Sequence, residues 1–295
     1  MRPSYGDFIL EQERKERKKR RMVILTVVLV LVLIIVGVGV ALFLKKDGFH
    51  FDFKSLFPEK EVMETVEDTE KRVFYTQEEL DDLFAYFDDH QMQAAVHCIG
   101  DRAMDMVIEA IAKSPNRTGN PKNRHGLVHV QITNPRILEN MKKHDILAYI
   151  QPVFVDLDMG IVEAQVGPQR MDKVYAWKTM LDMGIHTSGG SDAPVVSFDV
   201  MENIYFAVTR KDINGQPEEG WIPSEKMSVD EAVKLFTKYA AYASYTEDEN
   251  GTIEPGKWAD MVVLEKDIYE IDPDAIKDTK IDMTILAGKV VYERQ

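Results

Sequence analysis

The most constraining feature of this sequence is a regular alternation of short apolar runs with segments whose apolar residues recur at helical spacing. The apolar runs have the length of strands and lack the polar alternation of a half-exposed strand. They lie at residues 92–99, 125–132, 146–152 and 184–194. Because buried strands separated by helices pair in parallel through helical crossovers, we expect an α/β fold built on a parallel sheet.

The helical segments begin at recognisable signals. Thr76 with Glu79, and Ser228 with Glu231, have the spacing of a capping box. Helices are predicted at residues 76–90, 101–114, 133–145, 171–183, 198–210 and 228–244. After residue 246 short β-type runs are separated by glycine turns, which predicts a small antiparallel sheet at the end of the chain.

Three side chains of metal-ligand type lie at equivalent places in this pattern. His97, His129 and Asp192 stand at or near the carboxyl ends of three predicted strands, where parallel α/β folds collect their functional residues. A lone strand histidine is more often a core residue, but three such residues at one edge favour a functional site. Cys98, the only cysteine, follows His97, so strand alternation turns it to the opposite face as a packed apolar side chain.

The N-terminal region predicts a membrane anchor. Residues 22–44 are 23 residues without a charge, and a helix of that length spans a hydrocarbon core of about 30 Å. Seven cations stand before this run and two follow it. The excess predicts a single-pass protein with its N-terminus in the cytoplasm and its C-terminal domain outside. A cleaved signal peptide is the alternative, although its apolar region is normally about 7–15 residues long.

Charge is distributed unevenly along the chain. The net charge is −14, but residues 1–46 carry +6, which leaves −20 for the remainder. A body this acidic is poorly suited to nucleic-acid phosphates, so nucleic acid is excluded as a partner. The chain is predicted to consist of a basic cytoplasmic segment (1–21), a transmembrane helix (22–44), a juxtamembrane linker (45–74), a barrel-like α/β part (75–245) and a small β-subdomain (246–295).

Four separated motifs carry a family resemblance. They are AVHCIGDRAMD, RHGLVHVQ, GGSDAPV and GTIEPGKWADMVVL…ILAGKVVYE, in this order. From about Tyr75 to Arg294 the chain resembles the C-terminal part of the metal-dependent amidohydrolases, specifically amidohydrolase family 3. The resemblance implies the C-terminal half of a (β/α)8 TIM-like barrel with a small β-sandwich remnant. It also implies hydrolysis of a non-peptide amide or related C–N bond of a small molecule with a divalent metal ion, usually zinc.

The resemblance also implies roles for individual residues. His97 matches the ligand histidine that ends the fifth barrel strand, His129 that of the sixth, and Asp192 the aspartate that ends the eighth. That aspartate commonly binds metal and shuttles the proton of the attacking water. Imidazole and carboxylate groups suit zinc, which lowers the pKa of bound water from about 15.7 toward about 7. His125 points the same way as His129 on one strand, and two positions remain open for it: contact with a metal ligand or with substrate, and a place at the rim.

The family's first four barrel strands have no counterpart in this sequence. Ahead of Tyr75 there is no H-x-H motif such as ends the first strand, and an open half-barrel exposes sheet edges that proteins usually protect. Three explanations are open. The half-barrel pairs with a second copy or a complementing N-terminal half, it is an inactive remnant, or it belongs to a spliced or mis-assembled reading frame. Two functional hypotheses follow: a membrane-tethered amidohydrolase-like enzyme, and a non-catalytic membrane-anchored binding or assembly protein that retains half of the barrel.

Overall fold

The computed structural model describes residues 74–114 and 123–295. The chain divides into two compact units, Met1–Arg72 and Val73–Gln295, and all described residues belong to the second. The predicted membrane span at 22–44 and the segments flanking it lie outside the described residues. Within the described ranges, no helix combines the length and apolar character that crossing a bilayer requires.

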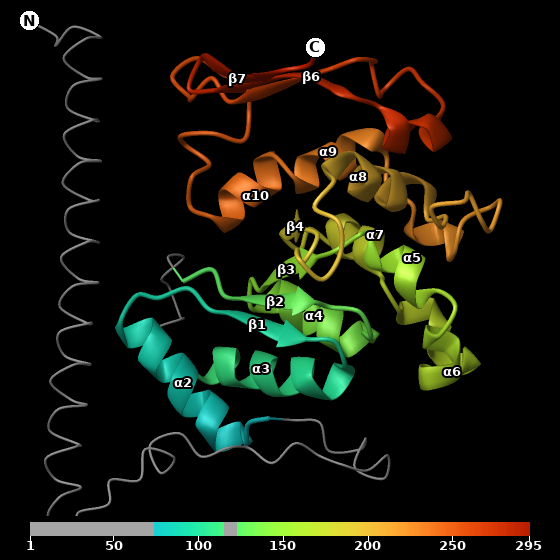
Figure 1. Ribbon diagram of the computed structural model, residues 1–295. Helices are drawn as coiled ribbons and strands as arrows, with labels where there is room; N and C mark the ends of the chain where they lie inside the picture. Colours follow the sequence, from blue (N-terminus) through green and yellow to red (C-terminus); the bar gives the residue numbers. More distant parts are fainter. Residues whose placement is uncertain (1–73, 115–122) are drawn as a thin grey trace, which may run out of the picture. The chain divides into compact units, whose positions relative to one another are not determined.

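A four-stranded parallel sheet lies at the centre of the described unit (Figure 1). Its strands are β1 (Ala95–Cys98), β2 (Gly126–His129), β3 (Leu147–Ile150) and β4 (Thr187–Gly189). They lie in the order of the sequence, and each neighbouring pair is parallel. The parallel sheet predicted from the apolar runs is therefore confirmed, although each strand is shorter than its run because the flanking residues enter the loops.

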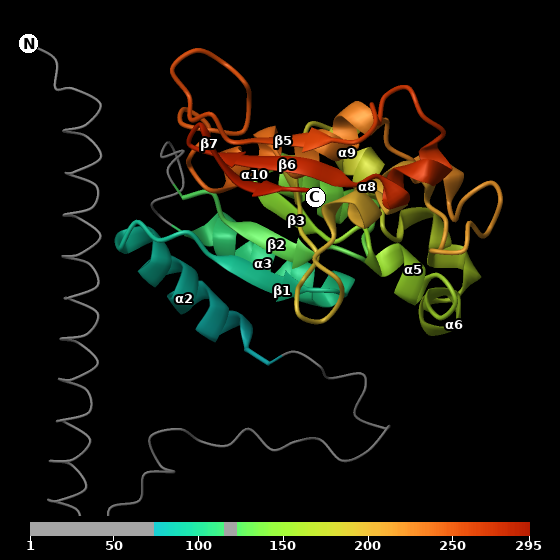
Figure 2. The ribbon, with the colours of Figure 1, turned by 45° about the horizontal axis from the view of Figure 1, so that its top comes forward.

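Helices alternate with these strands as predicted. Helix α2 (Gln77–Asp89) precedes β1, the connecting helices are α3 (Asp101–Lys113), α4 (Pro135–Lys143) and α7 (Trp177–Asp182), and α8 (Val200–Thr209) follows the sheet. Helices α2 and α3 lie side by side next to β1 in both views (Figures 1 and 2). The buried side chains of α3 include Met104, Ile108 and Ile111, so its apolar stripe faces the sheet.

Both predicted capping boxes are present. The Thr76 hydroxyl accepts the Glu79 N–H at 3.2 Å, and the Glu79 carboxylate accepts the Thr76 N–H at 2.7 Å. Ser228 and Glu231 repeat this exchange at the next box. The single helix predicted over 228–244 is wrong: it is divided into α9 (Val229–Leu235) and α10 (Lys238–Ala243) because Thr237, at φ −126° and ψ −96°, leaves helical geometry.

The connection between β3 and α7 contains helical turns that the sequence pattern did not predict. They are α5 (Phe154–Asp158), α6 (Val162–Val166) and the 3-10 helix η3 (Pro168–Lys173). As a result α7 starts at Trp177, later than the predicted position 171. The short 3-10 helices η4 (Pro223–Glu225) and η5 (Pro273–Asp278) lie further along the chain.

The end of the chain forms the small antiparallel sheet predicted for it. Its strands are β5 (Met261–Leu264), β6 (Ile281–Leu286) and β7 (Lys289–Glu293), in the order β5-β6-β7. Both pairings are antiparallel. All five residues of β7 are exposed, so this strand is an uncovered edge of the described sheet.

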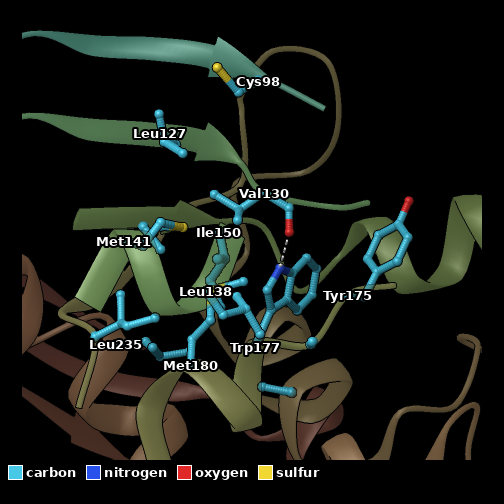
Figure 3. Packing of buried hydrophobic residues seen from close by; sticks show 14 of the residues in the cluster. Cys98, Leu127, Val130, Leu138, Met141, Ile150, Tyr175, Trp177, Met180 and Leu235 are labelled. Carbon is cyan, nitrogen blue, oxygen red and sulfur yellow. Dashed lines mark hydrogen bonds between the residues drawn. The ribbon is translucent and has the colours of Figure 1, made fainter. Parts of the chain in front are cut away.

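The core lies where the parallel sheet meets its helices (Figure 3). Cys98, Leu127 and Ile150 bring three strands into this cluster, and each side chain is fully buried. The prediction that Cys98 packs as an apolar residue is thus confirmed, and burial raises the pKa of its thiol to about 12. Trp177 of α7 packs in the same cluster and donates its indole N–H to the carbonyl of Val130 at 3.3 Å.

Candidate active site

His97 and His129 come together at the carboxyl edge of the parallel sheet. His97 belongs to β1 and His129 ends β2, and the parallel register of the two strands places Cys98 opposite His129. Nδ1 of His97 lies 2.9 Å from Nε2 of His129, and the ring planes cross at 75°. The structure therefore unites two of the three residues that the sequence nominated as metal ligands.

Gln151, at the end of β3, fixes the orientation of the His129 ring. Its amide N–H donates to the Tyr149 carbonyl at 3.2 Å, so its oxygen faces His129 and accepts the Nδ1–H at 2.9 Å. This network assigns the proton of neutral His129 to Nδ1 and leaves a lone pair on Nε2, toward His97. A ring held through one nitrogen, with a lone pair on the other, is the arrangement typical of metal-ligating histidines.

The surroundings of His129 favour its neutral form. Burial is the largest cause that lowers its pKa, and the neighbouring His97 ring lowers it further. The hydrogen bond with Gln151 and the charges of Asp192 and Asp158 act in the opposite direction, but the net pKa remains below the usual value. Neutral imidazole is the form that binds metal ions.

The backbone at this edge adopts uncommon conformations. His129 and Val130 have φ values of 78° and 51°, and Asp192 has 63°. A positive φ is unfavourable for a β-branched residue such as Val130, and such residues cost about 1–3 kcal/mol each. The Trp177 indole holds the Val130 carbonyl, so the core retains the turn that follows His129 (Figure 3).

Asp192 does not join the two histidines in a three-ligand cluster. It is exposed, and it lies three residues beyond β4 in the loop that leads toward α8. Its charge reaches His129, where it raises the imidazole pKa. Among residues 74–114 and 123–295, however, no group of three histidine, cysteine, aspartate or glutamate side chains is close enough to hold a metal ion. The role of Asp192 as third ligand and proton shuttle stays a prediction.

The two histidines themselves fit a zinc ion. Nitrogen ligands on a tetrahedral zinc, at bond lengths of about 2.05 Å, lie about 3.3 Å apart. The pair in the structure is 2.9 Å apart, so a small opening of the two rings meets this geometry. His129 already points a lone pair into the gap, and loss of the Nδ1 proton from His97 supplies the second.

His125 lies at the opposite end of β2 from His129. It is fully buried, its Nε2 donates to a carboxylate oxygen of Asp88 at 2.9 Å, and its Nδ1 accepts the Ala94 N–H at 3.0 Å. Asp88 also accepts hydrogen bonds from Ser114 and Asn123. These contacts give His125 a structural place under α2, and they do not support the contact with a metal ligand or substrate that the sequence left open for it.

The fold and the paired histidines place this chain among the α/β proteins whose functional residues collect at the carboxyl edge of a parallel sheet. The sequence profile of the amidohydrolase family matches residues 56–292. The chain belongs to the amidohydrolase family, as the four motifs predicted.

Known relatives extend well beyond this chain. Over 204 residues the chain is 38% identical to the putative amidohydrolase YtcJ of Bacillus subtilis (strain 168). This alignment covers 69% of this chain and 38% of YtcJ. The chain is 28% identical over 225 residues to the N-substituted formamide deformylase of Arthrobacter pascens, covering 75% of this chain and 40% of the deformylase. The chain therefore spans about two fifths of the length of these relatives.

A solved structure supports the same fold. A metal-dependent hydrolase from Pyrococcus horikoshii OT3 superposes with a TM-score of 0.60 at 24% identity, covering 68% of this chain and 39% of that one. At this level of identity the likeness concerns the fold, and it agrees with the α/β architecture described above.

Sequence reasoning missed Gln151 and Asp158. A signal for Gln151 was present, since it is a polar residue at the carboxyl end of a buried strand, next to a proline. Asp158 lies in the connection after β3, where nothing in its local sequence pattern shows which side chain it contacts.

Proposed function

We propose that this chain is part of a metal-dependent amidohydrolase that cleaves a non-peptide C–N bond of a small amide. The observation that carries this proposal is the facing pair of His97 and His129, with Gln151 behind the second ring. Membership of the amidohydrolase family supports hydrolysis as the reaction class. Zinc is the metal that a site with two imidazoles and one carboxylate favours.

The residues of this edge would divide the chemistry among them. His97 and His129 would hold the divalent ion through Nδ1 and Nε2, and Gln151 would keep the His129 ring in register. When bound, the ion supplies a lowered water pKa and a polarised substrate carbonyl. Asp192, in the loop beyond β4, is suited to take a proton from water and to return it to the departing nitrogen.

The experiment that tests this proposal is a zinc titration of the full-length chain. The unmutated protein is expected to bind about one equivalent of zinc, and His97→Ala or His129→Ala is expected to weaken binding at least tenfold because each removes one ligand. His90→Ala, an exposed histidine that stacks on Tyr86, is the matched control. A chain that takes up no zinc contradicts the proposal.

A second candidate function is a non-catalytic binding or assembly protein. It is favoured by the lack of a three-ligand cluster within the described residues. Addition of a separate H-x-H-containing N-terminal half separates the two candidates. Restored amide hydrolysis excludes the non-catalytic reading, whereas zinc binding that never leads to turnover with any supplied half supports it.

We further propose a single membrane anchor at residues 22–44, with the N-terminus in the cytoplasm and the enzyme-like unit outside. The uncharged run and the excess of cations before it support this topology. Carbonate extraction and protease protection of intact cells test it. Release of the chain by carbonate, or protection of its C-terminal unit, contradicts the topology.

A further inference from the structure

The segment after β3 contributes a second polar group to the edge that holds the histidines. Gln151 contacts His129, and the Phe154 ring of α5 packs edge-on against the His129 ring at 5.8 Å. Asp158 ends this same helix, and it accepts the side-chain N–H of Gln131, two residues beyond His129, at 3.3 Å. The carboxylate of Asp158 therefore belongs to the neighbourhood of the two histidines without being one of their hydrogen-bond partners.

Two donors hold Asp158 through a single oxygen. The Tyr175 hydroxyl and the Gln131 amide N–H both donate to Oδ2, the latter at 3.3 Å. Within residues 74–114 and 123–295, both hydrogen bonds of the carboxylate end on Oδ2, none reaches Oδ1, and no cation pairs with it. Asp158 is half-buried, so it presents one unused oxygen from a fixed position.

The donors are themselves held in place. The Tyr175 backbone N–H donates to the Gln131 carbonyl at 2.7 Å, and an isolated bridge joins Ile132 to Val174 beside it. Tyr175 and Gln131 are both buried. Burial and the hydrogen bond to Asp158 raise the pKa of the Tyr175 phenol far above its usual range, so this hydroxyl remains a donor.

We propose that Asp158 is a substrate-binding residue that uses Oδ1 to recognise an ammonium or other cationic N–H group on the amide cleaved at the histidine edge. The inference rests on the proposed function and adds a substrate class to it, namely amides that carry a positive charge a few bonds from the scissile C–N bond. A carboxylate fixed by neutral donors, with no cation of its own, is a group prepared to bind a cation.

The alternative role for Asp158 is to fasten α5 to the Tyr175 segment. A fastening residue needs only an oxygen that accepts from Tyr175 and Gln131, and asparagine supplies one. Recognition of a cation requires the negative charge. Asp158→Asn therefore separates the two roles, because it keeps the shape and one acceptor oxygen for Tyr175 and Gln131 but replaces the other oxygen by an uncharged NH2 group.

The test compares binding of two nearly isosteric amides to the zinc-treated full-length chain by ligand-observed NMR. The cationic probe is N-acetyl-1,4-diaminobutane, and the neutral one is N-pentylacetamide, in which a methyl group replaces the ammonium group. The unmutated chain is expected to bind the cationic amide about tenfold more tightly, as hydrogen bonds to charged groups suggest. Asp158→Asn is expected to remove this preference while the affinity for the neutral amide is retained.

Asp156→Asn is the matched control, since Asp156 lies on the same helix and accepts the Ile213 N–H at 2.8 Å instead. It should keep the preference. Equal binding of both amides by the unmutated chain, failure of both to bind, or a preference that survives in Asp158→Asn overturns the inference. Zinc uptake is measured in the same samples. A chain that binds zinc but does not prefer the cationic amide refutes the inference alone. A chain that prefers the cationic amide but takes up no zinc refutes the proposed function alone.

Discussion

At the scale of single residues, the candidate site depends on residues that orient the two histidine side chains. The two histidines are the proposed ligands, and their geometry is set by Gln151 on one side and by the strained turn at Val130 on the other. A metal site without such support loses affinity even when all its ligands are present. The variants that are most informative at this scale therefore alter supporting residues and leave the ligands intact.

Replacing Gln151 tests this support directly. We expect Gln151→Leu to weaken zinc binding about 10–100-fold, because the His129 ring loses the acceptor that fixes its tautomer and orientation. Gln151→Glu, which keeps an acceptor oxygen, should retain most of the affinity. Zinc titration measures both, and Gln165→Leu, an exposed glutamine of α6, serves as control. Equal affinity in Gln151→Leu and the unmutated chain would show that the ring is held by something else.

The buried cluster around Asp88 makes a prediction about pH. Burial by itself raises the pKa of Asp88, but hydrogen bonds from Ser114, Asn123 and His125 outweigh it, so the pKa is lowered overall. A lowered folded-state pKa contributes stability above the unfolded value of about 3.9, and that stability is lost as the pH falls through the folded value. The free energy of unfolding should therefore decrease below about pH 4.

The variant that isolates this effect is Asp88→Asn. It should lower the free energy of unfolding at pH 6 by about 1–3 kcal/mol, because charge-assisted hydrogen bonds to a buried carboxylate are lost. The variant should also show a weaker decrease of stability between pH 5 and pH 3. Urea unfolding at several pH values measures both, with the exposed Asp82→Asn as control. A parallel pH dependence in variant and unmutated chain rules out Asp88 as the source.

At the scale of elements, the order and direction of the strands follow from local patterns. Buried apolar runs joined by helices form a parallel sheet, and the start of α9 is fixed by the capping box of Ser228 and Glu231. Where the pattern failed, at the break after Leu235, the cause is the Thr237 backbone, whose geometry depends on neighbours rather than on spacing.

The capping box of α9 provides a prediction at this scale. We expect Ser228→Ala to reduce the free energy of unfolding by about 1 kcal/mol, because the Glu231 N–H loses its acceptor. Ser244→Ala removes a hydroxyl from an exposed position at the end of α10, and it should change stability by less than about 0.5 kcal/mol. Thermal or urea unfolding compares them. Equal losses in the two variants would contradict a capping role.

At the scale of the whole described unit, the small sheet is incompletely covered. Its exposed apolar residues lie on all three strands and include neighbours that point to opposite faces, namely Val262, Val263, Leu286, Val290, Val291 and Tyr292. An edge strand that is exposed along its whole length is also a template for pairing with another chain. This surface favours association with a second copy or a complementing half over an isolated monomer.

Self-association through this sheet is the corresponding prediction. We expect the full-length chain in detergent to associate with rising concentration, and Val290→Lys to weaken the association at least tenfold because it places a charge on the edge strand. Ile161→Lys makes the same change at an exposed isoleucine of the connection between α5 and α6. Sedimentation velocity measures the species present. An equal effect of the two lysines would mean that association does not use the sheet.

The sequence by itself determined the class of fold, the parallel sheet, the positions of His97 and His129 at its carboxyl edge, and the family. These follow from spacing and motifs, because strand and helix periods are local properties of the chain. Only the tertiary structure decided that the two histidines face each other, that His125 is a buried partner of Asp88, and that Gln151 contacts His129. Those contacts join residues 22 to 37 positions apart in the sequence. They depend on strand register and loop packing, which the local periodicity of the sequence does not encode.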